Sequence, residues 1–320
     1  MSQPFHIAFC VDGNYFRAMA ATVSSILERN PSQPFVFHIF TFDFDRDTAD
    51  RLRLMDKPPL VTTELHIVDQ NRLNEFRGYF GSSHYSPAIF LRLLIPSFLK
   101  GKIDRVLYLD ADILCFGSLD SLIELENFDE IAAVVLDAPE TVRRRCKALD
   151  IDSGQYFNSG VMLLNVEAWL SEGITDRTLR ELSVGRKDMR FPDQDALNLA
   201  LHGRVKFLEK RFNYLYDLIH DLNIQRLNLR PLGDAVLVHF AGSVKPWSLW
   251  TGHSVCQLFK QFLSLSPWSG TELDVIPTNS KEMRMHSRFL FRRGELLNSL
   301  HWYFEYLKVK AMKYLKLAGV

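Results

Sequence analysis

Cysteine is scarce in this chain of 320 residues, and the four that occur are too far apart for a C-x-x-C pair: Cys10, Cys115, Cys146 and Cys256. Because most of them stand in apolar surroundings, we expect reduced core residues of a cytosolic protein. The chain also has no run of 18 apolar residues, so we predict no membrane-spanning helix. No basic and apolar leader precedes the first predicted strand, and we therefore expect no signal peptide.

A net charge is absent as well, because 38 Lys and Arg balance 38 Asp and Glu, which argues against a protein that coats nucleic acid. The balance hides an asymmetry: residues 281–320 hold nine Lys and Arg against three Glu, which leaves a net of −6 on the preceding 280 residues. Aromatic residues lie between the cations of that segment: Phe289, Phe291, Trp302, Tyr303 and Phe304. This pattern is typical of helices on anionic membrane surfaces, with a helix docked on the domain as the alternative.

The most informative stretch is a short apolar run, Val106–Leu109, followed by Asp110 and Asp112. In an extended chain, residues two apart share a face, so these carboxylates point the same way and repel unless a cation lies between them. Carboxylate oxygens suit Mg²⁺ or Mn²⁺, and open α/β sheets bind ligands at the carboxyl ends of their strands. We predict a divalent metal that holds substrate phosphates. A solvated turn and the nucleophile of a haloacid-dehalogenase-type phosphatase are alternatives that this stretch alone leaves open.

Strand and helix patterns alternate along the chain, which predicts an α/β fold with a parallel sheet. The predicted strands are His6–Val11, Phe35–Phe42, Glu64–Val68, Val106–Leu109, Ile131–Leu136, 155–165 and Val236–Phe240. The predicted helices are Tyr15–Arg29, Asp47–Met55, Ala88–Leu94, Val166–Leu170, Ile174–Leu182 and a helix from Phe191 to Leu201.

Several predicted strands end in polar residues, namely Asp12 with Asn14, Asp110 with Asp112, Asp137, Asn158 and His239. One such strand means little, but five suggest convergence on a single site. Two further residues have a plain alternative reading. Asp193 fits the N-cap of its helix, and Arg92, the one charge on an apolar helix, fits either a surface residue or a partner for phosphate.

Six motifs in this order resemble the retaining glycosyltransferases of family 8, most of all the bacterial members that add hexoses to the lipopolysaccharide core. They are 12–15 (DGNY), 86–92 (SPAIFLR), 107–112 (LYLDAD), 156–160 (YFNSG), 192–195 (PDQD) and 239–247 (HFAGSVKPW), and the match covers most of residues 5–270. The resemblance implies the GT-A (Rossmann-like) fold, with a mixed, mostly parallel sheet and a helical C-terminal extension. It also disfavours the phosphatase, because three predicted strands precede Asp110. We expect a catalytic domain at 1–275 and a basic, aromatic, membrane-associating extension at 276–320.

The resemblance also implies that the matched positions together bind a UDP-hexose, with Mn²⁺ or alternatively Mg²⁺ on its diphosphate. The implied metal ligands are Asp110, Asp112 and His239, with Ala111 in the same donor-binding turn. The implied donor-binding residues are Cys10, Asp12, Asn14 and Tyr15 at the uridine, Arg92 at the sugar and diphosphate, and Gly242 and Lys245 at the diphosphate. The residues implied around the donor hexose are Asp137, Asn158, Asp193 and Gln194, and His84 is a weaker candidate at the acceptor.

The implied reaction is transfer of glucose or galactose to a sugar hydroxyl of the lipopolysaccharide core with retention, which gives an α-glycosidic bond. Gln194 occupies the β-face position, and an amide is a poor nucleophile, so we favour substitution on one face of the sugar, with Asp193 as a covalent nucleophile in second place. The remaining alternatives are a glycogenin-like or other family 8 enzyme with a different acceptor, and a peripheral carbohydrate-binding protein without turnover. For the favoured function, the expected location is cytoplasmic and peripheral to the inner membrane.

Overall fold

The computed structural model describes residues 3–13, 15–69, 87–125, 128–152, 154–184 and 189–317. The chain divides into two compact units. The first holds residues 1–215 and 234–239, and the second holds residues 216–233 and 240–320.

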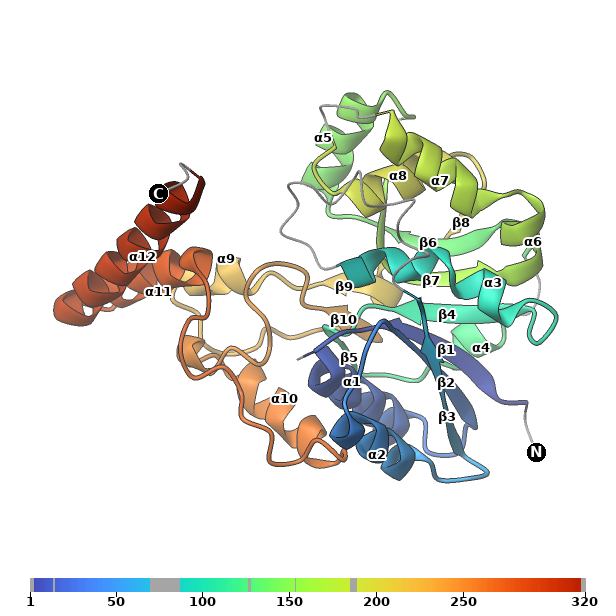
Figure 1. The fold of residues 1–320 in the computed structure, drawn as a ribbon, viewed down its shortest axis with the longest axis horizontal. Helices are drawn as coiled ribbons and strands as arrows, with labels where there is room; N and C mark the ends of the chain where they lie inside the picture. The colour runs from blue at the N-terminus through green and yellow to red at the C-terminus, as the bar shows by residue number, and fades with distance from the viewer. Residues whose placement is uncertain are drawn as a thin grey trace. The chain divides into compact units, whose positions relative to one another are not determined.

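Seven of the described strands form the central sheet of the first unit, in the order β3-β2-β1-β4-β7-β6-β8 (Figure 1). Their bounds are β1 (Phe5–Cys10), β2 (Phe35–Thr41), β3 (Val61–Ile67), β4 (Arg105–Leu109), β6 (Ala132–Leu136), β7 (Phe157–Asn165) and β8 (Val205–Phe207). Strands β3, β2, β1 and β4 are parallel, β7 is antiparallel to β4 and β6, and β8 is parallel to β6. The predicted mixed, mostly parallel sheet is confirmed.

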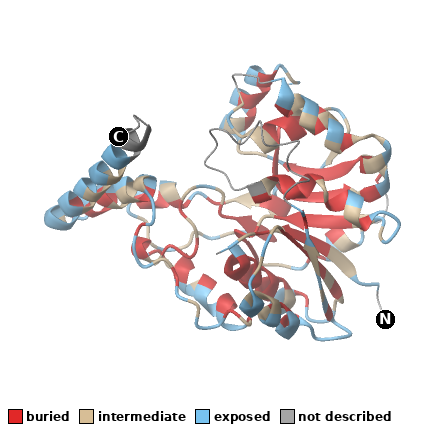
Figure 2. Cartoon of the chain, viewed as in Figure 1, coloured by how far each residue is buried: buried red, intermediate tan, exposed pale blue. Residues whose placement is uncertain are grey.

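The central strands are buried on both faces, as Figure 2 shows by their colour. In β7, every residue from Phe157 to Leu164 is buried, and Val106–Leu109 of β4 are at most 1% exposed. Strands covered on both faces read as continuous apolar runs, which is why β4 was easy to find in the sequence.

The helices of the first unit agree with the predicted alternation. They are α1 (Tyr15–Arg29), α2 (Arg46–Met55), α3 (Ile95–Leu99), α4 (Asp120–Ile123), α5 (Pro139–Leu149), α6 (Val166–Ser171), α7 (Ile174–Ser183) and α8 (Pro192–Ala200). Local capping fixes some of their starts: Asp45 accepts a hydrogen bond from the backbone of Thr48 before α2, and Asn165 accepts one from Ala168 before α6.

One predicted helix, Ala88–Leu94, is instead a 3-10 helix, η2 (Pro87–Leu93), which α3 follows. The backbone N–H of Leu94 donates to Leu91 O, which is the tighter i to i−3 bond. Pro96 lies in the first turn of α3, where its missing N–H costs nothing. Arg92, near the end of η2, is only 4% exposed, so it is not a surface residue.

A smaller sheet, in the order β5-β10-β9, also belongs to the first unit. It contains β5 (Ile113–Cys115), β10 (Leu237–His239) and β9 (Tyr214–Leu215), which follows the 3-10 helix η3 (Lys210–Asn213). The antiparallel pairing of β10 with β5 sets His239 opposite Ile113.

The second unit is helical, which confirms the predicted helical C-terminal part. It contains α9 (Leu218–Asn223), η4 (Leu249–Thr251), α10 (Val255–Ser264), α11 (Ser280–Arg292) and α12 (Leu296–Leu317). Asn279 caps α11 by accepting from the backbone of Lys281 and Glu282, while the Glu282 side chain accepts from the backbone of Thr278. Among the described residues, no helix combines the length and the apolar character needed to cross a bilayer.

Candidate active site

The turn between β4 and β5 carries the two predicted metal carboxylates, Asp110 and Asp112. Helix α1 holds this turn through Thr22, whose hydroxyl donates to Ile113 O at 2.6 Å and lies 3.1 Å from Ala111 O. Asp112 is 8% exposed and Ala111 is 7% exposed. The buried hydroxyl therefore fixes the backbone that presents both carboxylates.

His239 of β10 completes a three-residue group with these carboxylates. Its Nε2 lies 3.1 Å from Asp112 Oδ1 and 3.7 Å from Asp110 Oδ2, and one ligand atom from each residue falls within 4.8 Å of the others. Gly160 of β7 faces this group: a Cβ there would lie 2.7 Å from His239 Nδ1 and 2.9 Å from Asp110 Oδ2. A side chain at position 160 would fill the space beside these residues, and glycine leaves it open. Two carboxylates and one imidazole are ligands that fit a divalent cation such as Mn²⁺ or Mg²⁺.

The tautomer of His239 follows from a chain of buried hydrogen bonds. The backbone N–H of Gly160 can only donate, so Asn158 Oδ1 accepts from it at 3.0 Å, and the same oxygen accepts from Asn213 Nδ2 at 2.9 Å. Asn213 Oδ1, 3.1 Å from His239 Nδ1, is then the acceptor of the ring N–H. The lone pair of His239 is therefore on Nε2, toward the two carboxylates, as a metal ligand requires.

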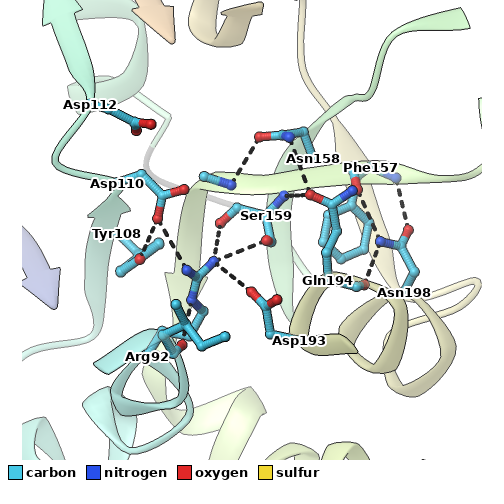
Figure 3. A network of polar contacts seen from close by, with 12 residues as sticks. Arg92, Tyr108, Asp110, Asp112, Phe157, Asn158, Ser159, Asp193, Gln194 and Asn198 are labelled. Carbon is cyan, nitrogen blue, oxygen red and sulfur yellow. Dashed lines mark hydrogen bonds and ion pairs between the residues drawn. The ribbon is translucent and has the colours of Figure 1, made fainter. Parts of the chain in front are cut away.

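The amide of Gln194 is oriented in the same way (Figure 3). Its Oε1 accepts from the backbone N–H of Ser159 at 3.1 Å, so its Nε2 donates to Asp137 Oδ2 and to Tyr156 Oη, both at 2.9 Å. The Tyr156 hydroxyl donates onward to Asp195 Oδ1 at 2.6 Å. A backbone donor thus locks the amide of Gln194 against rotation.

Arg92 connects Asp193 to the group formed by Asp110, Asp112 and His239. Its Nη2 lies 3.2 Å from Asp110 Oδ1, its Nη1 lies 3.5 Å from Asp193 Oδ2, and Nη1 also donates to Ser159 Oγ at 2.9 Å (Figure 3). Burial raises the pKa of Asp193, while the positive charge of Arg92 opposes that rise. The guanidinium therefore holds two carboxylates, on different elements, beside one another.

The alternative reading of Asp193 as an N-cap is wrong. The N-cap position of α8 is Phe191, and no side chain caps the helix from there. Asp195 Oδ2 accepts from the backbone of the two residues before the helix, Arg190 at 2.8 Å and Phe191 at 2.9 Å. Against the rise that burial causes, the backbone N–H groups of Asp193 and Gln194, in the first turn, lower the pKa of the Asp193 carboxyl by hydrogen bonding to it. The carboxylate of Asp193 therefore interacts both with the first turn of α8 and with Arg92 in the site.

The first unit brings most of the predicted site residues into one connected group. That group contains Arg92, Asp110, Asp112, Asp137, Asn158, Asp193, Gln194 and His239. Cys10, at the end of β1, is close enough for Arg92 and Asp110 to influence its thiol, although burial is the main cause that raises its pKa.

The other predicted residues are described only locally. Asp12 follows β1, and its carbonyl accepts from the backbone N–H of Tyr15 at 2.9 Å, at the start of α1. Asn14 and His84 lie outside the described residues. Gly242 and Lys245 belong to the second unit, where Gly242 has a φ of 141° and Lys245 Nζ donates to Phe240 O at 3.3 Å.

The residues that the sequence reading missed are those that orient others. Asn213 sets the tautomer of His239, Tyr156 and Asp195 fix Gln194, and Gly160 leaves room for a cation. Tyr108, whose hydroxyl donates to Asp110 Oδ1 at 2.5 Å, was read only as a strand residue. The available signal for Asn213 was a polar residue directly before a short apolar run, which is too common to select it.

Replacing Asn213 with alanine is expected to lower the affinity for Mn²⁺ by about 10–100-fold, because Asn213 orients a ligand without being one. Replacement with aspartate should recover much of the loss, since a carboxylate oxygen can still accept from His239 Nδ1. Direct titration of the purified protein with Mn²⁺ measures both effects. An unchanged Mn²⁺ dependence in Asn213→Ala would show that the tautomer is set by something else.

Comparison with known proteins agrees with this geometry. Residues 6–251 match the family model "Glycosyl transferase family 8", and residues 254–310 match "Glycosyl transferase family 8 C-terminal". The chain is 33% identical, over 97% of its length and 92% of the relative, to lipopolysaccharide 1,3-galactosyltransferase of Salmonella typhimurium. It is 32% identical, over 83% of its length and 80% of the relative, to lipopolysaccharide 1,2-glucosyltransferase of Escherichia coli.

The fold is likewise similar to solved structures. The crystal structure of the galactosyltransferase LgtC, in complex with donor and acceptor sugar analogs, superposes with a TM-score of 0.69 at 22% identity. That match covers 85% of this chain and 98% of LgtC. The two family models together span nearly all of the described residues. The chain belongs to glycosyl transferase family 8 and is a glycosyltransferase.

Proposed function

We propose that this enzyme transfers glucose or galactose from a UDP-sugar to a sugar hydroxyl of the lipopolysaccharide core, with retention and hence an α-glycosidic bond. The proposal rests on two connections from the proposed cation ligands to the residues expected around the sugar. Arg92 contacts both Asp110 and Asp193. Asn158 contacts Gln194 directly and His239 through Asn213. One network thus links a place for a diphosphate-bound cation to a place for the sugar. The names of the two similar bacterial enzymes supply the acceptor class.

Asp110, Asp112 and His239 would hold the cation, for which we propose Mn²⁺ with Mg²⁺ as the alternative. When bound, it supplies positive charge that stabilises the leaving diphosphate. Arg92 would bind the diphosphate and sugar, and we retain Gly242 and Lys245 as further diphosphate contacts. Cys10, Asp12, Asn14 and Tyr15 remain proposed contacts of the uridine.

The locked amide of Gln194 favours substitution on one face of the sugar. Its Nε2 is already engaged by Asp137 and Tyr156, and an amide oxygen is a poor nucleophile. The bond from the anomeric carbon to the leaving phosphate oxygen breaks, a bond to the acceptor oxygen forms on the same face, and the leaving phosphate oxygen takes the acceptor proton. Asp137 and Asn158 would position the hexose, and their negative and dipolar groups favour the cationic transition state.

Asp193 is the second candidate, as a nucleophile that forms a covalent glycosyl intermediate. Its side chain is 13% exposed and lies 3.5 Å from Arg92 Nη1, so it is positioned by a guanidinium as a nucleophile would need to be. Trapping with a slow donor such as a fluorinated UDP-sugar, followed by mass spectrometry, separates the two mechanisms. A hexose adduct on the Asp193 peptide favours the covalent path, and no adduct during turnover favours the same-face path.

The experiment that tests the proposed function is UDP release with each donor against a series of truncated core acceptors. We expect turnover with UDP-glucose or UDP-galactose, a requirement for a divalent cation, and a strong preference for one core acceptor. Incorporation of sugar into the protein itself would instead indicate the glycogenin-like alternative. Binding of core sugar without UDP release would indicate a carbohydrate-binding protein.

We also propose that residues 276–320 associate with the cytoplasmic surface of the inner membrane while 1–275 form the catalytic domain. Large apolar side chains are exposed on α11 and α12: Phe291, Leu296, Leu297, Leu300, Tyr303, Phe304, Leu307 and Met312. A cavity of about 300 Å³ in the same unit is lined by four cations and by apolar side chains that include Met285 and Phe289. The cations are Lys281, Arg284, Arg288 and Arg292, which suit an anionic headgroup. Phe289 is 4% exposed and lines this cavity, so it does not belong to the exposed apolar surface, and the expectation that its ring contacts the membrane is wrong.

Replacing both Leu297 and Phe304 with serine is expected to lower binding to anionic vesicles by roughly tenfold or more, because each loses apolar area that would enter the interface. These side chains are 84% and 59% exposed, so the fold should tolerate the change. Leu54→Ser, at an α2 residue that is 68% exposed, is the matched control. Vesicle flotation measures the effect, and equal flotation of both variants with the parent would remove the membrane proposal.

A further inference from the structure

A second group of metal-ligating side chains lies in the first unit, on two neighbouring strands of the large sheet. His38 of β2 stands directly opposite Glu64 of β3, and His66 follows two residues later on the same face of β3. Among the described residues, this is the one group besides Asp110, Asp112 and His239 whose ligand atoms all lie within 4.8 Å of one another. Nothing in the glycosyl transfer reaction uses it.

The distances within the group match those of a tetrahedral metal site. His38 Nδ1 lies 3.1 Å from His66 Nε2 and 3.3 Å from Glu64 Oε2, and His66 Nε2 lies 3.7 Å from Glu64 Oε2. A tetrahedron with ligand atoms about 2.0–2.2 Å from Zn²⁺ has edges of about 3.3–3.6 Å. The three atoms therefore form one face of such a tetrahedron, which leaves the fourth position for a water molecule.

Hydrogen bonding alone satisfies these atoms less well. If both rings donated to Glu64, their N–H groups would meet at the 3.1 Å separation between His38 Nδ1 and His66 Nε2, and the 3.7 Å separation from His66 to Glu64 is too long for a hydrogen bond. If His38 Nδ1 donated, its single N–H would be shared between His66 Nε2 at 3.1 Å and Glu64 Oε2 at 3.3 Å, and water would have to complete the half-exposed carboxylate. A cation is the arrangement that uses all three lone pairs.

The surroundings also suit a metal. His6 Nδ1 of β1 lies 2.9 Å from His38 Nε2, so it can accept the second ring N–H of His38 and orient that ring. The His66 ring stacks on Phe40 at 4.4 Å and meets Phe98 edge to face at 6.0 Å. Glu64 is 45% exposed, which leaves a path to solvent.

We propose that His38, Glu64 and His66 form a binding site for a borderline transition-metal cation of the Zn²⁺ class, with one coordination position left to water. Two imidazoles and one carboxylate select such a cation over Mg²⁺, which prefers oxygen ligands. The site would join β3, the edge strand of the large sheet, to β2. It is distinct from the carboxylate-rich group of the active site in its ligands, its strands and its preferred metal.

The test uses zinc itself and the full-length chain in which the active-site group has been disabled by Asp112→Asn and His239→Ala. We expect this parent to retain one Zn²⁺ per chain after equilibrium dialysis, and to show the strong visible absorption of four-coordinate Co²⁺ when cobalt replaces zinc. Adding His66→Ala should lower zinc affinity by roughly a hundredfold or more, and His6→Ala by about 10–100-fold. Adding His202→Ala, which removes the exposed His202–Asp152 pair instead, should change nothing.

Glu64→Gln keeps the test decisive if His66→Ala fails to fold, because Glu64 is half-exposed and the change is nearly isosteric. Metal-free thermal unfolding should give the same Tm for parent and Glu64→Gln, and Zn²⁺ should raise the Tm of the parent only. Zinc binding that is absent in the parent, or equal in the parent and the Glu64→Gln variant, overturns the proposal.

Discussion

Replacing Asp112 with asparagine, or His239 with alanine, is expected to lower kcat/KM for glycosyl transfer by roughly a hundredfold or more, the scale of a lost electrostatic group in a transition state. Each change removes one of the three ligand atoms around the proposed cation while leaving the sheet intact. Both residues lie at strand ends, so little core volume is lost. Asp152→Asn, at a carboxylate that is 72% exposed, is the matched control and should keep full activity.

The measurement is UDP release across a range of Mn²⁺ concentrations, together with thermal unfolding of each variant. Partial recovery of Asp112→Asn at high Mn²⁺ supports a weakened metal site. Loss of activity accompanied by a large drop in Tm would instead mean that the substitution disturbs the fold. Full activity of the parent enzyme after dialysis against EDTA would contradict the metal assignment.

Gly160→Ala should reduce activity by a similar factor without unfolding the protein. The added Cβ would lie 2.7 Å from His239 Nδ1 and 2.9 Å from Asp110 Oδ2, so at least one ligand has to move. Gly160 lies within β7 and has no positive φ, so alanine fits its backbone and the strain falls on the site. Overpacking of this kind costs about 1–3 kcal/mol of stability, less than the roughly 5–15 kcal/mol that typically separates the folded from the unfolded state, so the protein should stay folded.

Gly117→Ala provides the comparison for this prediction. Its Cβ would meet Val236 Cγ2 at 3.3 Å, a tight contact away from the three ligand atoms. Both variants should lose some stability, but only Gly160→Ala should need far more Mn²⁺ for half-maximal activity. If the two variants show the same Mn²⁺ dependence, the space beside Gly160 is not part of the metal site.

The sequence alone predicts the parts of the fold that depend on local pattern. Val106–Leu109 reads as a buried strand because both of its faces are covered, and the alternation with helices predicts the parallel part of the sheet. The difference at Ala88–Leu94 also has a local cause, because Pro96 favours the start of a new helix. The insertion of β7 antiparallel between β4 and β6 depends on contacts between distant segments, and no local pattern specifies it.

The residues of the site likewise fall into those that the sequence alone identifies and those that it does not. Asp110, Asp112 and His239 are chemically conspicuous at the ends of apolar runs, so they can be found as candidates. The sequence around Asn213 gives no comparable signal. Its role depends on hydrogen bonds to His239 and Asn158, which lie 26 and 55 positions away in the sequence. Positioning residues of this kind become visible only once the fold brings the segments together.

The measurement that tests the central claim most directly is the anomeric configuration of the product. The enzyme, Mn²⁺, a UDP-hexose and a truncated lipopolysaccharide core acceptor are incubated together, and the product is examined by proton NMR. A new α-linked glucose or galactose, with the small coupling constant of an α-anomeric proton, is the predicted result. A β-linked product would contradict retention and, with it, the roles proposed here for Gln194 and Asp193.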